Sequence, residues 1–316
     1  MSGYFPQGLL VQLLLLVTWI GGLLMIPAVA LLHLSGSDTA ATLVLLVVLW
    51  CYVGPVPPRG PLINWLNRNL SHAFREESML VEGGELDRSA PFLLAFHPHG
   101  MFSWGYFGHG GMHLALNPSD EVLPPTAVTG LITDVLVMQP LWRFVFIRWL
   151  RVLDSASKPA FLRLMRARKN IGLLPGGFHE ASISELGKDR VYLKKRFGFI
   201  KYALQFGYGV YPIYTFGESD TYYNPSGGYW WRLKLNDHDV PAIFPIGKWW
   251  CPLLPRHDVG LHTVVGKKLV LPKIEEPTPE DVAKWHAVYV GELKALFDRH
   301  KATCSARGAA AELEIW

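Results

Sequence analysis

The stretch "LLAFHPHGMFSWGYFGHGG", residues 93–111, places two histidines directly after an apolar run that has the composition of a buried strand. Pro98 fixes one φ angle and has no N–H to donate, and Gly100 permits a sharp or left-handed turn. Regular strand pairing is therefore expected to stop here, and a rigid turn presents the imidazoles of His97 and His99 at the end of the strand. The sequence predicts a site for chemistry at this turn.

Short apolar runs alternate with amphipathic stretches on both sides of the turn, a pattern typical of an α/β domain. Strands are predicted at 92–96, 127–129, 171–174, 210–216 and 262–265, and helices at 140–151, 159–169, 198–206 and 279–300. The last helix begins with "TPED", in which Thr278 is the predicted N-cap and Asp281 the acidic partner of a capping box. No internal repeat divides residues 57–316, which we expect to form one domain.

Two apolar runs precede this domain, at 8–34 and 39–56, and only "SGSD" separates them. The first contains no Asp, Glu, Lys or Arg, and at about 1.5 Å per residue it is long enough to cross a hydrocarbon layer of roughly 30 Å. Helices joined by so short a turn run antiparallel, so residues 1–56 are predicted to form a membrane hairpin that either spans the bilayer or dips into one leaflet. A cleaved signal peptide is disfavoured, because no basic residue precedes the run and its length exceeds an h-region.

Charge and cysteine content narrow the class of protein. Arg59, Arg68 and Arg75 follow the hairpin, so the positive-inside rule places residues 57–316 in the cytosol. The net charge of +4 comes without a long basic run, which argues against nucleic acid as a partner. Three widely spaced cysteines argue against both a disulfide framework and a zinc ribbon.

The histidines of the turn admit three interpretations. With His109 and His113 they could bind a metal, but the intervening proline spoils the strand spacing and residues 101–116 supply no carboxylate. A purely structural role is a second reading. We favour a general base, because an imidazole with a pKa near 6.5 is mostly neutral in the cytosol and accepts a hydroxyl proton.

A second informative stretch is "GLLPGGFHEASISE", residues 172–185, in which a strand leads into a glycine turn and then a helix. The backbone N–H groups of Gly176 and Gly177 are candidates to stabilise an oxyanion, and Glu180 could orient a histidine. The plainer readings are an ordinary turn and a carboxylate that complements a helix N-terminus. Basic residues flank the stretch, and most are expected to be a solvated face, although some could bind a phosphorylated substrate.

Six ordered blocks of this sequence resemble the type-2 diacylglycerol acyltransferase family, which also contains monoacylglycerol and wax-alcohol acyltransferases. They are "HPHG" at 97–100, "PGGFHEA" at 175–181, "RFGFIKYAL" at 196–204, "YPIYTFGESDTY" at 211–222, "TVVGKKLVLPKIEEPTPEDV" at 263–282 and "YVGELKALFDRHK" at 289–301. The resemblance implies a glycerolipid-acyltransferase-like mixed α/β sheet domain, anchored by the hairpin. It also implies acyl transfer from acyl-CoA to the hydroxyl of diacylglycerol, with a monoacylglycerol or a long-chain alcohol as the alternative acceptor.

The resemblance also assigns roles within the site. Relatives may carry Glu in place of the first histidine of the tetrapeptide, which favours His99 over His97 as the base. More distant glycerolipid acyltransferases place an aspartate five positions after their histidine, whereas this chain has Trp104 and Phe102 there. The carboxylate partner must come from elsewhere, and Glu180 is the candidate. Gly100, Gly176 and Gly177 would face the oxyanion, and Lys195, Arg196 and Lys201 would hold the phosphates of coenzyme A.

The resemblance further implies an endoplasmic-reticulum membrane protein that also occurs on lipid droplets, and a homo-oligomer is possible in principle. Acyl-CoA is a co-substrate, and no cofactor or metal is expected. Two rival functions fit the sequence less well. A serine-type lipid hydrolase is disfavoured, because the chain has no Gly-x-Ser-x-Gly elbow. A non-catalytic scaffold that uses only the hairpin would leave both glycine turns without a purpose.

Overall fold

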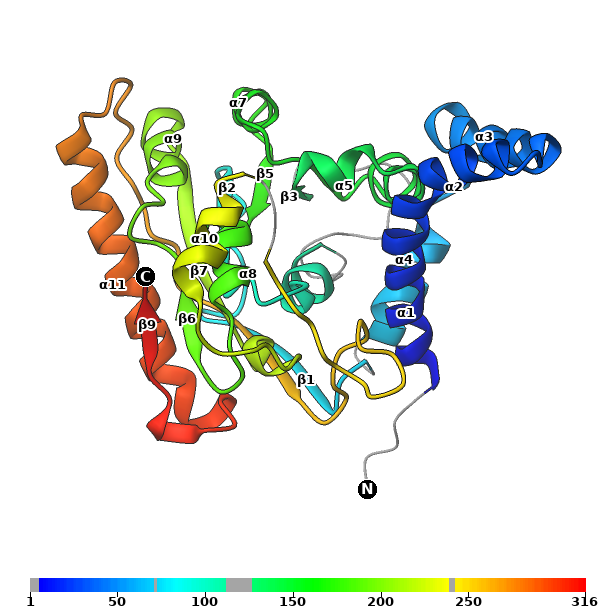
Figure 1. Ribbon diagram of the computed structural model, residues 1–316. Helices are drawn as coiled ribbons and strands as arrows, with labels where there is room; N and C mark the ends of the chain where they lie inside the picture. Colours follow the sequence, from blue (N-terminus) through cyan, green and yellow to red (C-terminus); the bar gives the residue numbers. More distant parts are fainter. Residues whose placement is uncertain (1–5, 71–72, 112–126, 239–241) are drawn as a thin grey trace.

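The computed structural model describes residues 6–70, 73–111, 127–238 and 242–316, and it is built around a seven-stranded sheet (Figure 1). The strand order is β1-β8-β7-β2-β5-β3-β4. The bounds of these strands are β1 Glu76–Val81, β2 Phe92–His97, β3 Val128–Ile132, β4 Leu153–Ser155, β5 Asn170–Leu173, β7 Gly209–Phe216 and β8 Gly260–Val265. Two short strands, β6 Asp189–Val191 and β9 Leu313–Ile315, form a separate parallel pair.

The sheet is mixed, as the sequence predicts. β2 lies at its centre and pairs in parallel with both β5 and β7. β8 runs antiparallel to β7 and pairs in parallel with β1 at the edge. The carboxyl ends of β2, β5 and β7 therefore meet at one edge of the sheet, which is where side chains from parallel strands converge on a site.

All five predicted strands are present, and β1, β4, β6 and β9 are additional. The helices are α1 Pro6–Leu16, α2 Gly22–Leu34, α3 Asp38–Val53, α4 Gly60–Leu70, α5 Asp134–Met138, α6 Pro140–Trp142, α7 Lys158–Arg166, α8 Gly177–Ile183, α9 Gly198–Phe206, α10 Tyr229–Asn236 and α11 Pro279–Cys304, with π-helical turns at Val17–Gly21, Tyr106–Gly111 and Arg143–Trp149 and 3₁₀ turns at Glu218–Asp220 and Gly308–Ala310. The predicted helix at 140–151 is thus a short α turn followed by a π turn. The predicted capping box is confirmed, because the Thr278 side chain accepts from the Asp281 N–H while the Asp281 carboxylate accepts from the Thr278 N–H.

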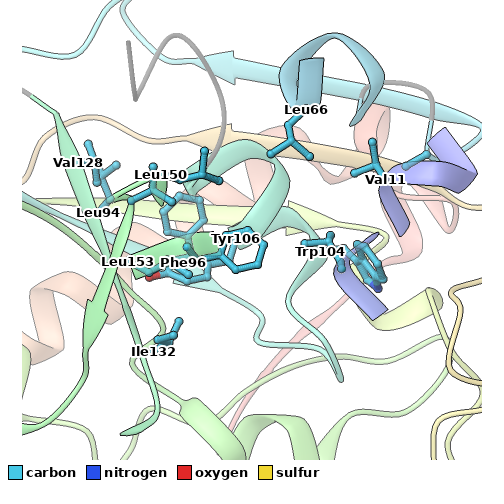
Figure 2. Close-up of a cluster of buried hydrophobic side chains, with 14 of the residues drawn as sticks. Val11, Leu66, Leu94, Phe96, Trp104, Tyr106, Val128, Ile132, Leu150 and Leu153 are labelled. Carbon is cyan, nitrogen blue, oxygen red and sulfur yellow. The ribbon is translucent and has the colours of Figure 1, made fainter. Parts of the chain in front are cut away.

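Helices cover both faces of the sheet, which explains why every residue of β2 is buried. Alternate side chains of a strand point to opposite faces. Phe92, Leu94 and Phe96 accordingly belong to one hydrophobic cluster, whereas Leu93 and Ala95 belong to a second. Figure 2 shows the first cluster, which extends from sheet residues such as Leu94 and Phe96, past Tyr106, to Trp104 and Val11 of α1.

The N-terminal segment is helical throughout its described part. α1, the following π turn and α2 form one continuous helix, and its residues Gly8–Leu34 are the single stretch in the described chain long and apolar enough to cross a membrane. α3, 16 residues long, is apolar but shorter, and it packs back against α2 to complete the predicted hairpin. Large aliphatic side chains of α2 and α3 are exposed, with Leu34 at 82% and Val53 at 80%.

The hairpin is in contact with the α/β domain at both of its ends. Val11 and Leu15 of α1 belong to the same core cluster as Phe96 of β2. At the other end, Arg148 donates to the carbonyl oxygens of Cys51 and Gly54, at 2.9 and 2.6 Å, where α3 ends. The helical hairpin therefore begins and ends in contact with the α/β domain, because α1 buries one apolar face against it.

Candidate active site

His97 ends β2 and is completely buried. Its Nε2 lies 2.9 Å from the hydroxyl of Tyr289 in α11, and its Nδ1 lies 3.5 Å from Oε1 of Glu180 in α8. That second separation is an ion-pair distance, and Nδ1 makes no hydrogen bond. Both ring nitrogens of His97 therefore face groups of the protein, Tyr289 in α11 and Glu180 in α8.

His99 lies two residues further, after a cis His97–Pro98 peptide, and is half-buried. Its Nδ1 lies 2.9 Å from the carbonyl oxygen of Gly100 and 3.1 Å from the hydroxyl of Ser103. A carbonyl only accepts, so Nδ1 carries the hydrogen and Nε2 keeps the lone pair. Within the described part of the chain Nε2 has no hydrogen-bond partner, which makes it the nitrogen available to take a proton.

The electrostatic setting of His99 suits a base. Burial lowers the pKa of its imidazole below the ordinary value of 6.5, while the bond to Gly100 and the charge of Glu180 act in the opposite direction. The ring is consequently neutral at neutral pH, which is the state that a general base requires.

Glu180 joins the two turns singled out in the sequence, but it contacts His97 where His99 was the predicted partner. Its Oε1 accepts from the Tyr192 N–H at 3.1 Å and lies against the His97 ring. Its Oε2 fills the space beside Gly176, where a Cβ would come within 2.2 Å of it. Glu180 thus acts on His99 only through its charge, because the buried His97 ring is the nearer imidazole.

The glycine turn before α8 differs from the prediction at one position. The N–H of Gly177 donates to the carbonyl of Leu174 at 3.2 Å, so it is already used by the turn. Gly177 instead provides a φ of 53°, which favours glycine. The N–H groups of Gly100 and Gly176 have no acceptor among the residues that the structure describes.

Arg196 reaches the same turn from the loop before α9. Its Nη2 donates to His179 Nδ1 at 2.6 Å and to the Gly176 carbonyl at 3.3 Å. His179 Nε2 in turn lies 3.3 Å from the carboxylate of Asp237, so both nitrogens of this imidazole are occupied. Burial, followed by the charge of Arg196, lowers the pKa of His179. Sequence reasoning gave His179 no role, although it stands inside the "PGGFHEA" block.

Lys195 and Lys201 flank Arg196 and are exposed, as residues that bind a solvent-borne phosphate must be before binding. The described residues contain no group of three His, Cys, Asp or Glu side chains that could hold a metal ion. His109, one of the residues weighed as a metal ligand, has its Nδ1 2.6 Å from the Thr263 hydroxyl. His113 lies outside the described residues.

The loop that follows His99 also touches the N-terminal helix. The ring of Phe102 packs edge-on against Trp19, with centroids 4.8 Å apart, and against Tyr222 at 5.0 Å. Trp19 lies near the middle of the long apolar helix. The candidate base is therefore three residues from a side chain that is in contact with the most hydrophobic part of the chain.

Comparison with known proteins shows the family of the chain. The family model described as "Diacylglycerol acyltransferase" matches residues 36–314, which include both turns and the sheet. The chain belongs to this diacylglycerol acyltransferase family. It is 33% identical over 242 residues to diacylglycerol O-acyltransferase 2 of Dictyostelium discoideum, covering 72% of this chain and 71% of the relative.

Other members of the family are named for different acyl acceptors. The chain is 31% identical over 235 residues to human acyl-CoA wax alcohol acyltransferase 2, covering 70% of this chain and 69% of the relative. It is 28% identical over 276 residues to human 2-acylglycerol O-acyltransferase 3, covering 81% and 80%. Membership of the diacylglycerol acyltransferase family makes the protein an O-acyltransferase.

Proposed function

We propose that the protein transfers an acyl group from acyl-CoA to the free hydroxyl of diacylglycerol, with His99 as the general base. The observation that carries this proposal is the lone pair of His99 Nε2, which Nδ1 leaves free by donating to the Gly100 carbonyl. In a diacylglycerol acyltransferase, the proton to be removed is that of the acceptor hydroxyl.

The reaction balances without a covalent enzyme intermediate. His99 Nε2 takes the hydroxyl proton as the oxygen forms a bond to the thioester carbonyl carbon. The carbonyl oxygen becomes an oxyanion, and we assign its stabilisation to the N–H groups of Gly100 and Gly176, which have no backbone acceptor among the described residues. When the tetrahedral intermediate collapses, the carbon–sulfur bond breaks and the imidazolium returns the proton to the leaving thiolate. The products are triacylglycerol and coenzyme A.

Two side chains hold the turns together in this proposal, the buried Glu180 and the partly buried Arg196. Glu180 fills the space beside Gly176 and lies against His97, so it links the candidate oxyanion donors to the end of β2. Arg196 fixes the Gly176 carbonyl from the other side. We assign Lys195 and Lys201, which are exposed next to Arg196, to the phosphates of acyl-CoA, since Arg196 itself is directed inward.

We further propose that the protein is associated with the endoplasmic-reticulum membrane and with lipid droplets, and that diacylglycerol reaches the site laterally. The apolar helix Gly8–Leu34 and the exposed leucines of α2 and α3 support membrane association. The contact between Phe102 and Trp19 supports lateral access, because it brings the catalytic loop to that helix. A second apolar surface lies in the segment between α10 and β8, where Trp249 is 91% exposed. An exposed tryptophan of this kind is typical of a membrane interface.

The acceptor is tested by competition. The purified full-length protein in mixed micelles receives one labelled acyl-CoA together with diacylglycerol, monoacylglycerol and a long-chain alcohol at equal surface concentration. Triacylglycerol is expected to be the main labelled product. Wax ester or diacylglycerol as the main product would transfer the assignment to the alternative acceptor while leaving the base in place.

The base is tested by His99→Gln, which is expected to lower the rate by about 10²–10⁴-fold. His300→Gln is the matched control. His300 lies on α11, away from both turns, and pairs with Glu82 at 2.8 Å. Loss of activity in the control alone, or normal activity of His99→Gln, would contradict the assignment.

A further inference from the structure

Glu218 is a buried carboxylate for which the acyl transfer described above has no use. It follows β7 through Gly217, within the "YPIYTFGESDTY" block, and is 1% exposed. Its two oxygens accept from two consecutive backbone amides, Oε1 from Trp104 at 2.9 Å and Oε2 from Gly105 at 2.7 Å. No cation of the described residues forms an ion pair with it. A buried charge in this state is costly, so its retention requires an explanation.

The two amides begin the helical turn that follows the loop of His99. Trp104 and Gly105 are its first residues, and their N–H groups are among those that a helix cannot satisfy internally. Glu218, in the 3₁₀ turn after β7, therefore caps this turn from a position 114 residues away along the chain. A carboxylate at a helix start also interacts favourably with the helix dipole.

The same carboxylate packs against the other end of the loop. A Cβ on Gly100 would lie 2.7 Å from both Cγ and Oε1 of Glu218, so only glycine fits there. Gly100 also has a φ of 57°, which favours glycine. Glu218 is consequently in contact with the first residue of the loop and bonded to the two residues that close it.

Both partners of His99 Nδ1 belong to this clamped loop. Gly100 supplies the carbonyl and Ser103, directly before Trp104, supplies the hydroxyl. Ser103 has a φ of 53°, an unfavourable value for a residue with a side chain, so the surrounding contacts must hold it. A shift of the loop would move both groups away from Nδ1. The hydrogen would then no longer be held on Nδ1, and Nε2 would no longer be kept free to accept a proton.

We propose that Glu218 is a positioning residue for acyl transfer, which clamps residues 100–105 and thereby fixes the orientation and tautomer of His99. The inference rests on the proposed role of His99 as base. Glu218 itself does not touch substrate. Burial raises the pKa of its carboxyl to about 7, which shows that burial disfavours the charged form. A positioning role explains why the protein retains this carboxyl at a cost in folding stability.

The test is Glu218→Gln, which keeps the volume but offers one acceptor oxygen to two N–H groups. It is expected to lower kcat by about 10–100-fold, with KM for acyl-CoA and for diacylglycerol changed by less than about threefold, because only the base is disturbed. In a protein that already carries His99→Gln, the same change is expected to cost less than about twofold, since groups that act as a unit are non-additive.

Glu82→Gln is the matched control. Glu82 is also a poorly exposed carboxylate, but it follows β1 and pairs with Arg299 and His300, and its loss is expected to leave kcat within about twofold. If Glu218→Gln does not yield folded protein, Ser103→Ala tests the same link from the other side of the loop, and it is expected to lower kcat by about 3–10-fold at normal thermal stability.

Three results would overturn the positioning role. They are a kcat within twofold of wild type in folded Glu218→Gln, a loss that multiplies with that of His99→Gln, and an unaffected Ser103→Ala where Glu218→Gln is unfolded. Normal activity of His99→Gln would instead refute the base on which the inference rests, so the two failures are distinguishable.

Discussion

The two histidines of the turn are expected to fail in opposite ways when each is changed to glutamine. His97 is fully buried between Glu180 and Tyr289, whereas His99 is half-buried and presents a free Nε2. We therefore predict that His97→Gln lowers stability and that His99→Gln lowers the rate. The comparison separates a structural imidazole from a catalytic one in a segment of only four residues.

The magnitudes follow from the contacts. Loss of the His97 ring leaves the Tyr289 hydroxyl without its 2.9 Å partner, which costs about 1–3 kcal/mol in a buried site. Glu180 adds no hydrogen-bond loss, because His97 Nδ1, 3.5 Å from its Oε1, makes no hydrogen bond. At about 2 °C per kcal/mol for a chain of this size, the melting temperature is expected to fall by roughly 2–6 °C. His99→Gln removes a ring with one free nitrogen and should change it by less than about 2 °C.

The assay combines thermal unfolding of the detergent-purified protein with initial rates of triacylglycerol formation, normalised to folded protein. His97→Gln is expected to retain measurable activity per folded molecule, while His99→Gln is expected to lose about 10²–10⁴-fold. Tyr208→Phe is a control for the loss of a buried hydroxyl elsewhere, since Tyr208 donates to carbonyls of Met165 and Lys169. A His97→Gln protein that is as stable as wild type and as inactive as His99→Gln would refute the reasoning.

Three further predictions concern pH and the carboxyl-terminal strand. Because burial lowers the pKa of His99, the rate is expected to fall only as the pH drops below about 6.5, and rates measured between pH 5 and 8 locate this limb. Burial raises the pKa of Glu218 from its ordinary value of 4.5 to about 7, so between these pH values the folded protein holds a proton that the unfolded chain has lost. Stability should therefore decrease as the pH rises from about 5 to about 8, and Glu218→Gln should flatten that slope in thermal melts. Deletion of residues 312–316 is expected to lower the rate by about tenfold. The Trp316 carbonyl accepts from the N–H groups of Leu193 and Lys194, and the neighbouring Tyr192 N–H donates to Glu180, so the deletion removes a support of Glu180. An unchanged rate would show that the β6–β9 strand pair does not support the active site.

Local physical chemistry determined much of this protein from the sequence alone. The apolar run before His97 forms the central strand because it is buried on both faces, and Pro98 and Gly100 end it with a turn. The capping box at Thr278 formed as predicted, since both of its bonds lie within four residues. The strand at Glu76–Val81 was not predicted, because an edge strand with alternating exposure and two leading glutamates lacks an apolar run.

Only the tertiary structure decided which carboxylate meets which imidazole. Glu180 was assigned to His99 but lies against His97, and Glu218 received no role although it clamps the loop of His99. Glu180 meets His97 because β2 and β5 pair in parallel, and Glu218 meets Trp104, 114 residues away in the loop of His99, because β2 and β7 pair in parallel. The choice depends on differences of a few ångströms in the packing of neighbouring strands and turns. Spacing along a chain carries no information on such distances, so the sequence could supply the residue types of the site but not their pairing.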